Sequence, residues 1–174
     1  MKNETQWFAL LTRSNFEQTV YSSICKKKID AFLPKMRKQS RRKDRKMMIE
    51  IPLFPGYIFV KSTTASADQL QILKTTGAVR LLGSTQGPVP VPEQHIESLK
   101  LLTSAGQDLI TGSIVQLKKG DPVMILEGPM AGLRGEFFEH KGHGRVIVKI
   151  DLLGQYAGVE VDSENVEKIP NILS

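Results

Sequence analysis

The histidines are the first candidates for metal binding, and the sequence has three of them, His95, His140 and His143. His140 and His143 form an HxxH pattern in the stretch EHKGHGR, and on a helix this spacing can bind a metal ion. Here the pattern lies in a glycine-rich turn between two predicted strands, with no cysteine or further histidine nearby. We therefore interpret it as a solvated hairpin tip, and His95, on a predicted helix, as a surface or packing residue.

Short motifs of common enzyme active sites are absent: the sequence contains no GxSxG, no HExxH and no Walker loop. The glycine-rich stretch GPMAGLRG at 128–135 lies between predicted strands and lacks the ending and the following helix that a phosphate cradle needs. The single cysteine, Cys25, excludes an intramolecular disulfide and has no His or Asp placed beside it as a catalytic partner. We predict that the protein is not an enzyme and has no cofactor; an enzyme with a distributed site is the disfavoured alternative.

The strongest charge feature is KMRKQSRRKDRK, residues 35–46, in which eight of twelve residues are Lys or Arg. Such a stretch can contact nucleic acid phosphates through counterion release, independently of base sequence. Lys26, Lys27 and Lys28 follow a predicted helix and can extend the basic surface. The alternative is a solvated loop whose charge adds only solubility.

The net charge of the 174-residue chain is +6, and it is unevenly distributed. Residues 1–112 hold 17 Lys/Arg and 9 Asp/Glu, whereas residues 113–174 hold 7 and 9, so the two parts carry +8 and −2. This asymmetry indicates two modules with different partners, of which the basic one suits nucleic acid. No apolar run reaches the roughly 20 residues of a spanning helix, and the start is unlike a secretory signal, so we expect a cytoplasmic protein.

The pattern of the first hundred or so residues alternates between strand and helix. It predicts strands at 7–13, 31–36, 57–62 and 78–83 and helices at 16–29, 66–76 and 92–104. The order β-α-β-β-α-β is that of the ferredoxin-like fold, here with extra elements. We therefore predict an α+β domain over residues 1–104, with an antiparallel sheet covered by helices on one face.

The rest of the chain has a different character. Residues 105–113 contain two glycines and no strong pattern, so we place a linker there. Five short strands are predicted beyond it, at 113–117, 122–128, 133–140, 145–154 and 156–166. Because no helix separates them, residues 114–174 are predicted to form a small five-stranded SH3-like β-barrel.

Three stretches resemble one known family. PLFPGYIFV at 52–60 closely resembles the signature of the NusG N-terminal (NGN) domain, and GDPVMILEGPMAGLRGEF at 120–137 resembles a KOW motif, which begins a five-stranded barrel in that family. LLGQYAGVEVDSENVEKI at 152–169 is similar to NusG-type C-termini. The chain thus resembles a NusG-family transcription elongation and antitermination factor. Its opening, WFALLTRSNFEQ, also resembles specialised members such as RfaH.

The resemblance implies that the N-terminal domain binds the clamp helices of RNA polymerase through a hydrophobic depression on its sheet. By bridging the polymerase cleft, such a domain penalises the opened, paused state and suppresses pausing without making or breaking a bond. Strand alternation places Tyr57 and Phe59 on one face and Ile58 and Val60 on the other, so one pair packs under the helices and the other can meet a partner. The expected polymerase-binding residues are Phe8, Phe16, Phe54, Pro55, Tyr57 and Phe59.

The resemblance also implies that the first helix and the basic loop meet DNA of the elongation complex. Lys26 and Lys27 match helix positions that serve this role in RfaH-like members, whereas Ser23 stands where a His is expected. The expected nucleic-acid-binding residues are Lys26, Lys27, Arg41, Arg42, Lys43 and Arg45.

KOW domains of the family recruit a further factor, either a small-subunit ribosomal protein or the termination factor Rho. The expected partner-binding residues here are Leu152, Leu153 and Gln155. Leu153 and Gln155 stand where NusG has Phe and Arg, which argues against Rho binding and for an antitermination paralogue. The stretch RVIVKIDLL is rich in β-branched residues, so we expect the barrel rather than the helical hairpin that RfaH can form.

An RNA- or ribosome-binding KOW module that acts in translation is the alternative function. It would need a basic barrel, whereas residues 113–174 carry a net charge of −2. We therefore expect a monomer whose partners are RNA polymerase, DNA and a KOW-bound factor, with no membrane partner and no metal.

Overall fold

The computed structural model describes residues 4–42, 46–116 and 120–170, and it divides the chain into two compact units, Met1–Ile96 and Glu97–Ser174. The predicted α+β class with antiparallel sheets is confirmed. The division between the units falls within helix α3 (Glu93–Ser104). The domain limits expected from the sequence, 1–104 and 114–174 with a linker at 105–113, stay a prediction.

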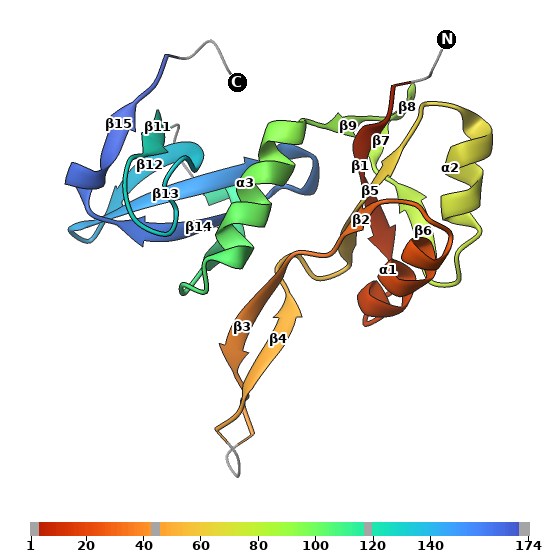
Figure 1. The fold of residues 1–174 in the computed structure, drawn as a ribbon, viewed down its shortest axis with the longest axis horizontal. Coiled ribbons are helices and arrows are strands. Elements are labelled where there is room, and N and C mark those ends of the chain that lie inside the picture. The colour runs from red at the N-terminus through yellow and green to blue at the C-terminus, as the bar shows by residue number, and fades with distance from the viewer. Residues whose placement is uncertain (1–3, 43–45, 117–119, 171–174) are drawn as a thin grey trace. The chain divides into compact units, whose positions relative to one another are not determined.

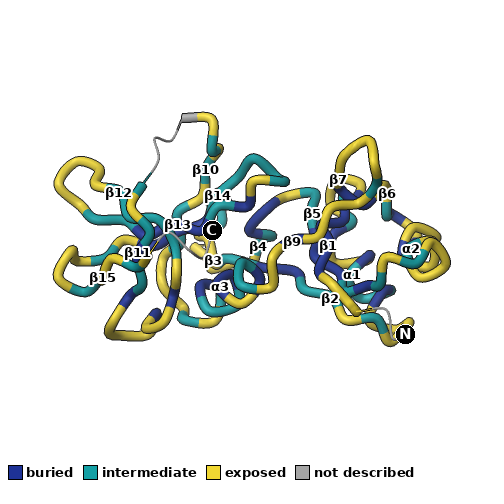
Figure 2. The backbone as a smooth tube through the Cα atoms, turned by 90° about the horizontal axis from the view of Figure 1, so that it is seen from above, coloured by how far each residue is buried: buried dark blue, intermediate teal, exposed yellow. Residues whose placement is uncertain are grey.

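The main sheet of the first unit is built around strand β1 (Gln6–Thr12), which pairs with β5 (Tyr57–Ser62) on one side and β6 (Ala78–Leu81) on the other. The outer strand β2 (Ala31–Phe32) pairs with β5, and β9 (Pro90–Val91) pairs with β1. Every pairing is antiparallel. Central β1 is the most buried strand of this sheet, as the dark blue backbone at its label in Figure 2 shows.

Helices α1 (Glu17–Lys26) and α2 (Ser66–Leu73) cover one face of this sheet. The core between sheet and helices contains Phe8, Leu10, Val20, Ile24, Ile58, Val60, Ile72 and Leu81. Helix α1 is shorter than the predicted 16–29 because Lys28 takes a positive φ of 58°, which ends the helical path. Helix α2 likewise ends before the predicted residue 76, and the chain turns at Gly77, where φ is +94°.

A second, two-stranded sheet consists of β3 (Lys35–Gln39) and β4 (Met48–Pro52), and it extends away from the main sheet of its unit (Figure 1). We call it the basic ribbon and use the name for residues 35–42 and 46–52. The single strand predicted at 31–36 is therefore two strands, β2 and β3, separated at Leu33-Pro34. Proline has no N–H for a sheet ladder, which explains the interruption. A short hairpin, β7 (Gly83–Ser84) and β8 (Gly87–Pro88), completes the strands of the unit among the described residues.

The second unit contains a six-stranded antiparallel sheet in the order β10-β14-β13-β12-β11-β15. Its strands are β10 (Ile110–Ser113), β11 (Asp121–Ile125), β12 (Arg134–His140), β13 (His143–Ile150), β14 (Gln155–Val161) and β15 (Val166–Lys168). The strand predicted at 113–117 is instead β10 followed by the short 3-10 helix η1 (Ile114–Gln116). Strand β10 lies within the segment that the sequence assigns to a linker. Residues 145–150 lie in β13, so the structure shows the β form and not a helical hairpin.

Candidate functional site

The second face of the main sheet lies opposite helices α1 and α2. Strand alternation gives this face the side chains that are not in the helix-covered core. It carries Trp7, Ala9 and Leu11 of β1 and Tyr57, Phe59 and Lys61 of β5. We call it the Tyr57 face. The sequence left open whether Tyr57 and Phe59 or Ile58 and Val60 pack under the helices, and the core shows that Ile58 and Val60 do.

The polymerase-binding residues predicted in residues 52–60 differ in exposure. Phe59 is completely buried and stacks on Phe32, its register partner on β2, with ring centroids 6.2 Å apart. Phe54 is also completely buried, whereas Tyr57 is half-buried and Pro55 is exposed. Of the four residues predicted there, Phe54, Pro55, Tyr57 and Phe59, a partner can therefore touch Pro55 and Tyr57 directly.

Two predicted polymerase-binding residues, Phe8 and Phe16, lie on the other side of the sheet. Phe8 is completely buried in the core with Val60, its register partner on β5. Phe16 is half-buried and packs against the same core. The structure thus brings Phe8 and Phe16 together beneath the helices and separates them from Tyr57 and Phe59.

The Pro55-Gly56 turn leads into β5 and is held by several hydrogen bonds. Gly56 takes a φ of +86°, which glycine adopts without steric cost. Its carbonyl accepts a bond from the Thr12 N–H at 2.8 Å, and its N–H donates to the carboxylate of Glu17 at 2.7 Å. Sequence reasoning did not identify Glu17, because its partner lies 39 residues further along the chain.

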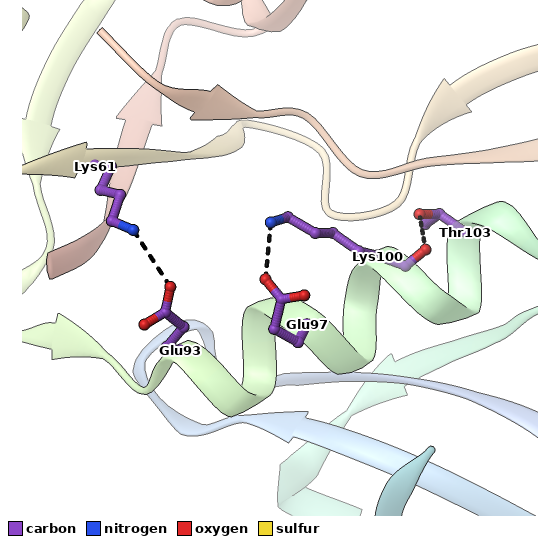
Figure 3. Close-up of polar contacts among 5 residues, drawn as sticks. All are labelled: Lys61, Glu93, Glu97, Lys100 and Thr103. Atoms are coloured by element: carbon purple, nitrogen blue, oxygen red, sulfur yellow. Dashed lines mark hydrogen bonds and ion pairs between the residues drawn. The ribbon is translucent and has the colours of Figure 1, made fainter. Parts of the chain in front are cut away.

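Lys61 and Trp7, which sequence reasoning also missed, form a cation–π contact on the Tyr57 face. The ammonium of Lys61 lies 5.7 Å from the centroid of the Trp7 ring. It also forms an ion pair with Glu93 at the start of α3, at 3.3 Å, shown in Figure 3. The first residue of α3 is thereby attached to strand β5 of the first unit.

The basic ribbon displays cations and apolar side chains together. Its exposed cations are Arg37, Lys38, Arg41, Arg42 and Lys46. Next to them, Met47, Met48 and Ile49 are exposed by 56%, 61% and 42%. The predicted residues Arg41 and Arg42 are therefore accessible to a polyanion, whereas the predicted residues Lys43 and Arg45 lie outside the described part of the chain.

The two lysines at the end of α1 differ in their contacts. Lys26 is exposed, but the ammonium of Lys27 donates to the Gln71 carbonyl and to the Thr75 hydroxyl, both at 2.8 Å. The charge of Lys27 is thus engaged with helix α2 and the residues that follow it.

Tyr21 lies on helix α1. Burial raises the pKa of Tyr21 above its usual value, and the neighbouring Cys25 raises it further.

The predicted partner-binding residues of the second unit lie between β13 and β14. Leu152 and Leu153 belong to the 3-10 helix η2 (Asp151–Leu153), and Gln155 is the first residue of β14; all three are half-buried. Gly154 between them takes a left-handed φ of 63°, and its carbonyl accepts a bond from the Ile114 N–H at 3.0 Å. The three side chains are therefore presented on one ordered turn.

The described residues hold no cluster of three or more His, Cys, Asp or Glu side chains that could bind a metal ion. His140 and His143 are exposed register partners at the tip of the β12–β13 hairpin. Within the same described ranges, no helix is long and apolar enough to cross a membrane.

Comparison with known proteins gives consistent matches. The family described as "Transcription termination factor nusG" matches residues 5–100. The "Transcription termination/antitermination protein NusG" of Deinococcus radiodurans is 29% identical over an alignment of 139 positions, which covers 71% of this chain and 72% of the relative. The protein of the same name from Borreliella burgdorferi is 24% identical over an alignment of 185 positions, gaps included, which covers 94% of this chain and 98% of the relative.

The fold has a solved counterpart. The structure described as "Domain interaction in Thermotoga maritima NusG" shares 24% identity and a TM-score of 0.55, covering 96% of this chain and 98% of that one. The family match extends over more than half of the chain and includes β1, α1 and the PLFPGYIFV stretch. The chain therefore belongs to the NusG family of transcription termination and antitermination factors.

Proposed function

We propose that this protein is an elongation and antitermination factor that binds RNA polymerase through the Tyr57 face of its first unit. The observation that carries the proposal is the division of β5 into two faces. Ile58 and Val60 are committed to the core beneath the helices, whereas half-buried Tyr57 and exposed Pro55 are not. Tyrosine is one of the residue types that dominate the binding energy of protein interfaces, and Tyr57 stands at the start of a strand paired with β1.

Phe54 and Phe59 have a supporting role in the proposed docking surface. Both are completely buried, so they shape the strand and turn that present Tyr57 and Pro55. Phe8 and Phe16 belong to the helix-covered core and act on docking only through the stability of the sheet. This assignment is narrower than the set expected from the sequence.

The basic ribbon is proposed to contact nucleic acid of the elongation complex. Exposed Arg37, Lys38, Arg41 and Arg42 provide phosphate-binding charge on a two-stranded element that extends from the sheet. Lys26 adds to this charge, whereas Lys27 contributes less because its ammonium already has two acceptors. Contacts to polymerase and to nucleic acid together would favour the closed, elongating state over the paused state.

The second unit is proposed to recruit a further factor through Leu152, Leu153 and Gln155. The candidates are a small-subunit ribosomal protein or Rho, and the protein acts as a monomer in the cytoplasm, without enzymatic activity and without a cofactor.

A transcription assay with purified core RNA polymerase tests the proposal. On a template with defined pause sites, the full chain should shorten the pauses or increase read-through of a terminator. Unchanged pausing and unchanged termination, at a protein concentration well above that of the polymerase, would contradict it. Salt-sensitive binding to RNA without any effect on polymerase would point instead to a module acting in translation.

A further inference from the structure

We propose that Glu17 is a positioning residue for the docking surface, because its carboxylate holds the Pro55-Gly56 turn that delivers Tyr57. Glu17 itself makes no contact with the partner. The inference rests on the proposed function, in which Tyr57 and Pro55 are the accessible docking residues.

The burial of Glu17 is the first observation that supports this role. Glu17 begins helix α1, yet it is only 6% exposed. Glutamate is rarely this buried without a partner, because removing a carboxylate from water is costly. One of its oxygens accepts the Gly56 N–H at 2.7 Å, a charge-assisted hydrogen bond to the backbone.

The hydrogen bonds of the turn are the second observation. Pro55 has no N–H, so the Gly56 N–H is the donor at the apex of the turn. The Gly56 carbonyl accepts from Thr12 at the end of β1, and the Tyr57 N–H donates to the Phe54 carbonyl at 3.1 Å. The turn is therefore attached to helix α1 on its donor side and to strand β1 on its acceptor side.

The position of Tyr57 depends on both attachments. Tyr57 is the first residue of β5 and pairs with Leu11, at the last register position of the β1–β5 ladder. Without the Glu17 bond, the Gly56 N–H loses its acceptor and the turn loses its attachment to α1, while its bond to β1 remains. A turn that samples several conformations presents Tyr57 and Pro55 in the docking geometry only part of the time. The apparent affinity is then reduced in proportion to the fraction of molecules in that geometry.

Two substitutions at Glu17 test the inference in the full chain. Glu17→Ala removes the acceptor, whereas Glu17→Gln keeps a carbonyl oxygen of nearly the same reach without the charge. Gln18→Ala is the matched control, since Gln18 is exposed and its side chain bonds to Ser22 and Lys35 instead of the turn. The readouts are hydrogen exchange of the Gly56 amide by NMR and the dissociation constant for core RNA polymerase.

Glu17→Ala is expected to accelerate Gly56 exchange and to weaken polymerase binding, each by about tenfold or more, the size typical for loss of a hydrogen bond to a charged group. Glu17→Gln, whose amide oxygen accepts a neutral hydrogen bond, should restore part of the Gly56 protection and part of the polymerase affinity. Gln18→Ala should match wild type in both measurements. Urea unfolding followed by the fluorescence of Trp7, the single tryptophan, checks that each variant is folded.

Two results would overturn the inference. One is unchanged Gly56 protection in folded Glu17→Ala, which would show that the carboxylate does not hold the turn. The other is a loss of Gly56 protection with unchanged polymerase affinity, which would make the bond purely structural. A wild-type chain that fails to bind polymerase would instead overturn the proposed function, and the Gly56 measurement would still decide whether Glu17 holds the turn.

Discussion

Lys61 and Trp7 face each other across β5 and β1, with the Lys61 ammonium 5.7 Å from the centroid of the indole ring. The Trp7 side chain is almost completely buried, and the Lys61 side chain is 28% exposed. A partly desolvated cation over an aromatic face is a favourable contact. Since the same ammonium pairs with Glu93, one lysine joins the two central strands to the first residue of α3.

Replacing Lys61 should therefore weaken the first unit modestly. We expect Lys61→Met to lower the free energy of unfolding by about 0.5–1.5 kcal/mol, from a cation–π contact and an ion pair whose glutamate is exposed. Trp7 fluorescence during urea unfolding measures this free energy, because Trp7 is the only tryptophan in the sequence. Lys74→Met is the control, an exposed lysine at the end of α2. Equal destabilisation by both variants would show that the contact at Trp7 has no special role.

Gly77, which connects α2 to β6, is expected to tolerate substitution poorly. An added Cβ would lie 2.7 Å from Phe16 Cδ1 and 2.9 Å from Val20 Cγ2, at a φ of +94°. Gly77→Ala should therefore cost about 2–4 kcal/mol, from backbone strain and overpacking combined. The matched control is Gly87→Ala, whose φ is +129° but whose Cβ would meet nothing within 4 Å. Equal effects of the two variants in urea unfolding would contradict the packing part of the argument.

Charge on the basic ribbon should determine how binding depends on salt. Neutralising Arg41 and Arg42 to Gln should flatten the plot of log affinity against log salt by about 0.7–0.9 for each phosphate that is no longer neutralised. Titrations of a transcription elongation complex at several salt concentrations give the slope. Neutralising Lys74, an exposed cation just after α2, and Arg80, an exposed cation on β6, should leave the slope unchanged. An unaltered slope in the ribbon variant would assign these charges to solubility.

The turn after β13 should determine partner choice in the second unit. Leu153→Phe with Gln155→Arg restores the residue types that the family resemblance associates with Rho. We expect this double variant to bind Rho more tightly than wild type, measured by calorimetry with the full chain. Leu152→Ala should weaken binding of a small-subunit ribosomal protein, because a half-buried leucine offers apolar contact. If wild type and the double variant bind Rho equally, this turn is not part of the partner-binding site.

The alternation of β5 was readable from the sequence, but the assignment of Phe8 was not. Period-two alternation separates Tyr57 from Ile58 in any register. Phe8 shares a face with Val60 only because β1 and β5 pair in one particular register. A slip of one residue would place Phe8 with Tyr57 and Phe59, as expected from the sequence, and register depends on turn geometry and packing across the chain.

The strand pairing of the basic ribbon was not predicted, for a different reason. Strands are recognised in a sequence by apolar residues that alternate toward a core, and β3 and β4 have mostly exposed side chains on both faces. Their pairing depends on backbone hydrogen bonds, which leave no compositional signal. The Glu17 bond to Gly56 is hidden likewise, since an acidic residue at a helix start is already explained by the helix dipole.

The affinity of core RNA polymerase for the Tyr57→Ala variant tests the central proposal most directly. Leu70→Ala is the matched control, because it truncates an exposed apolar side chain on α2, on the helix-covered side of the same sheet. If the Tyr57 face docks on polymerase, Tyr57→Ala should weaken binding by about tenfold or more, as truncation of an aromatic anchor does, while Leu70→Ala leaves it unchanged. Equal dissociation constants for wild type and folded Tyr57→Ala would contradict the account.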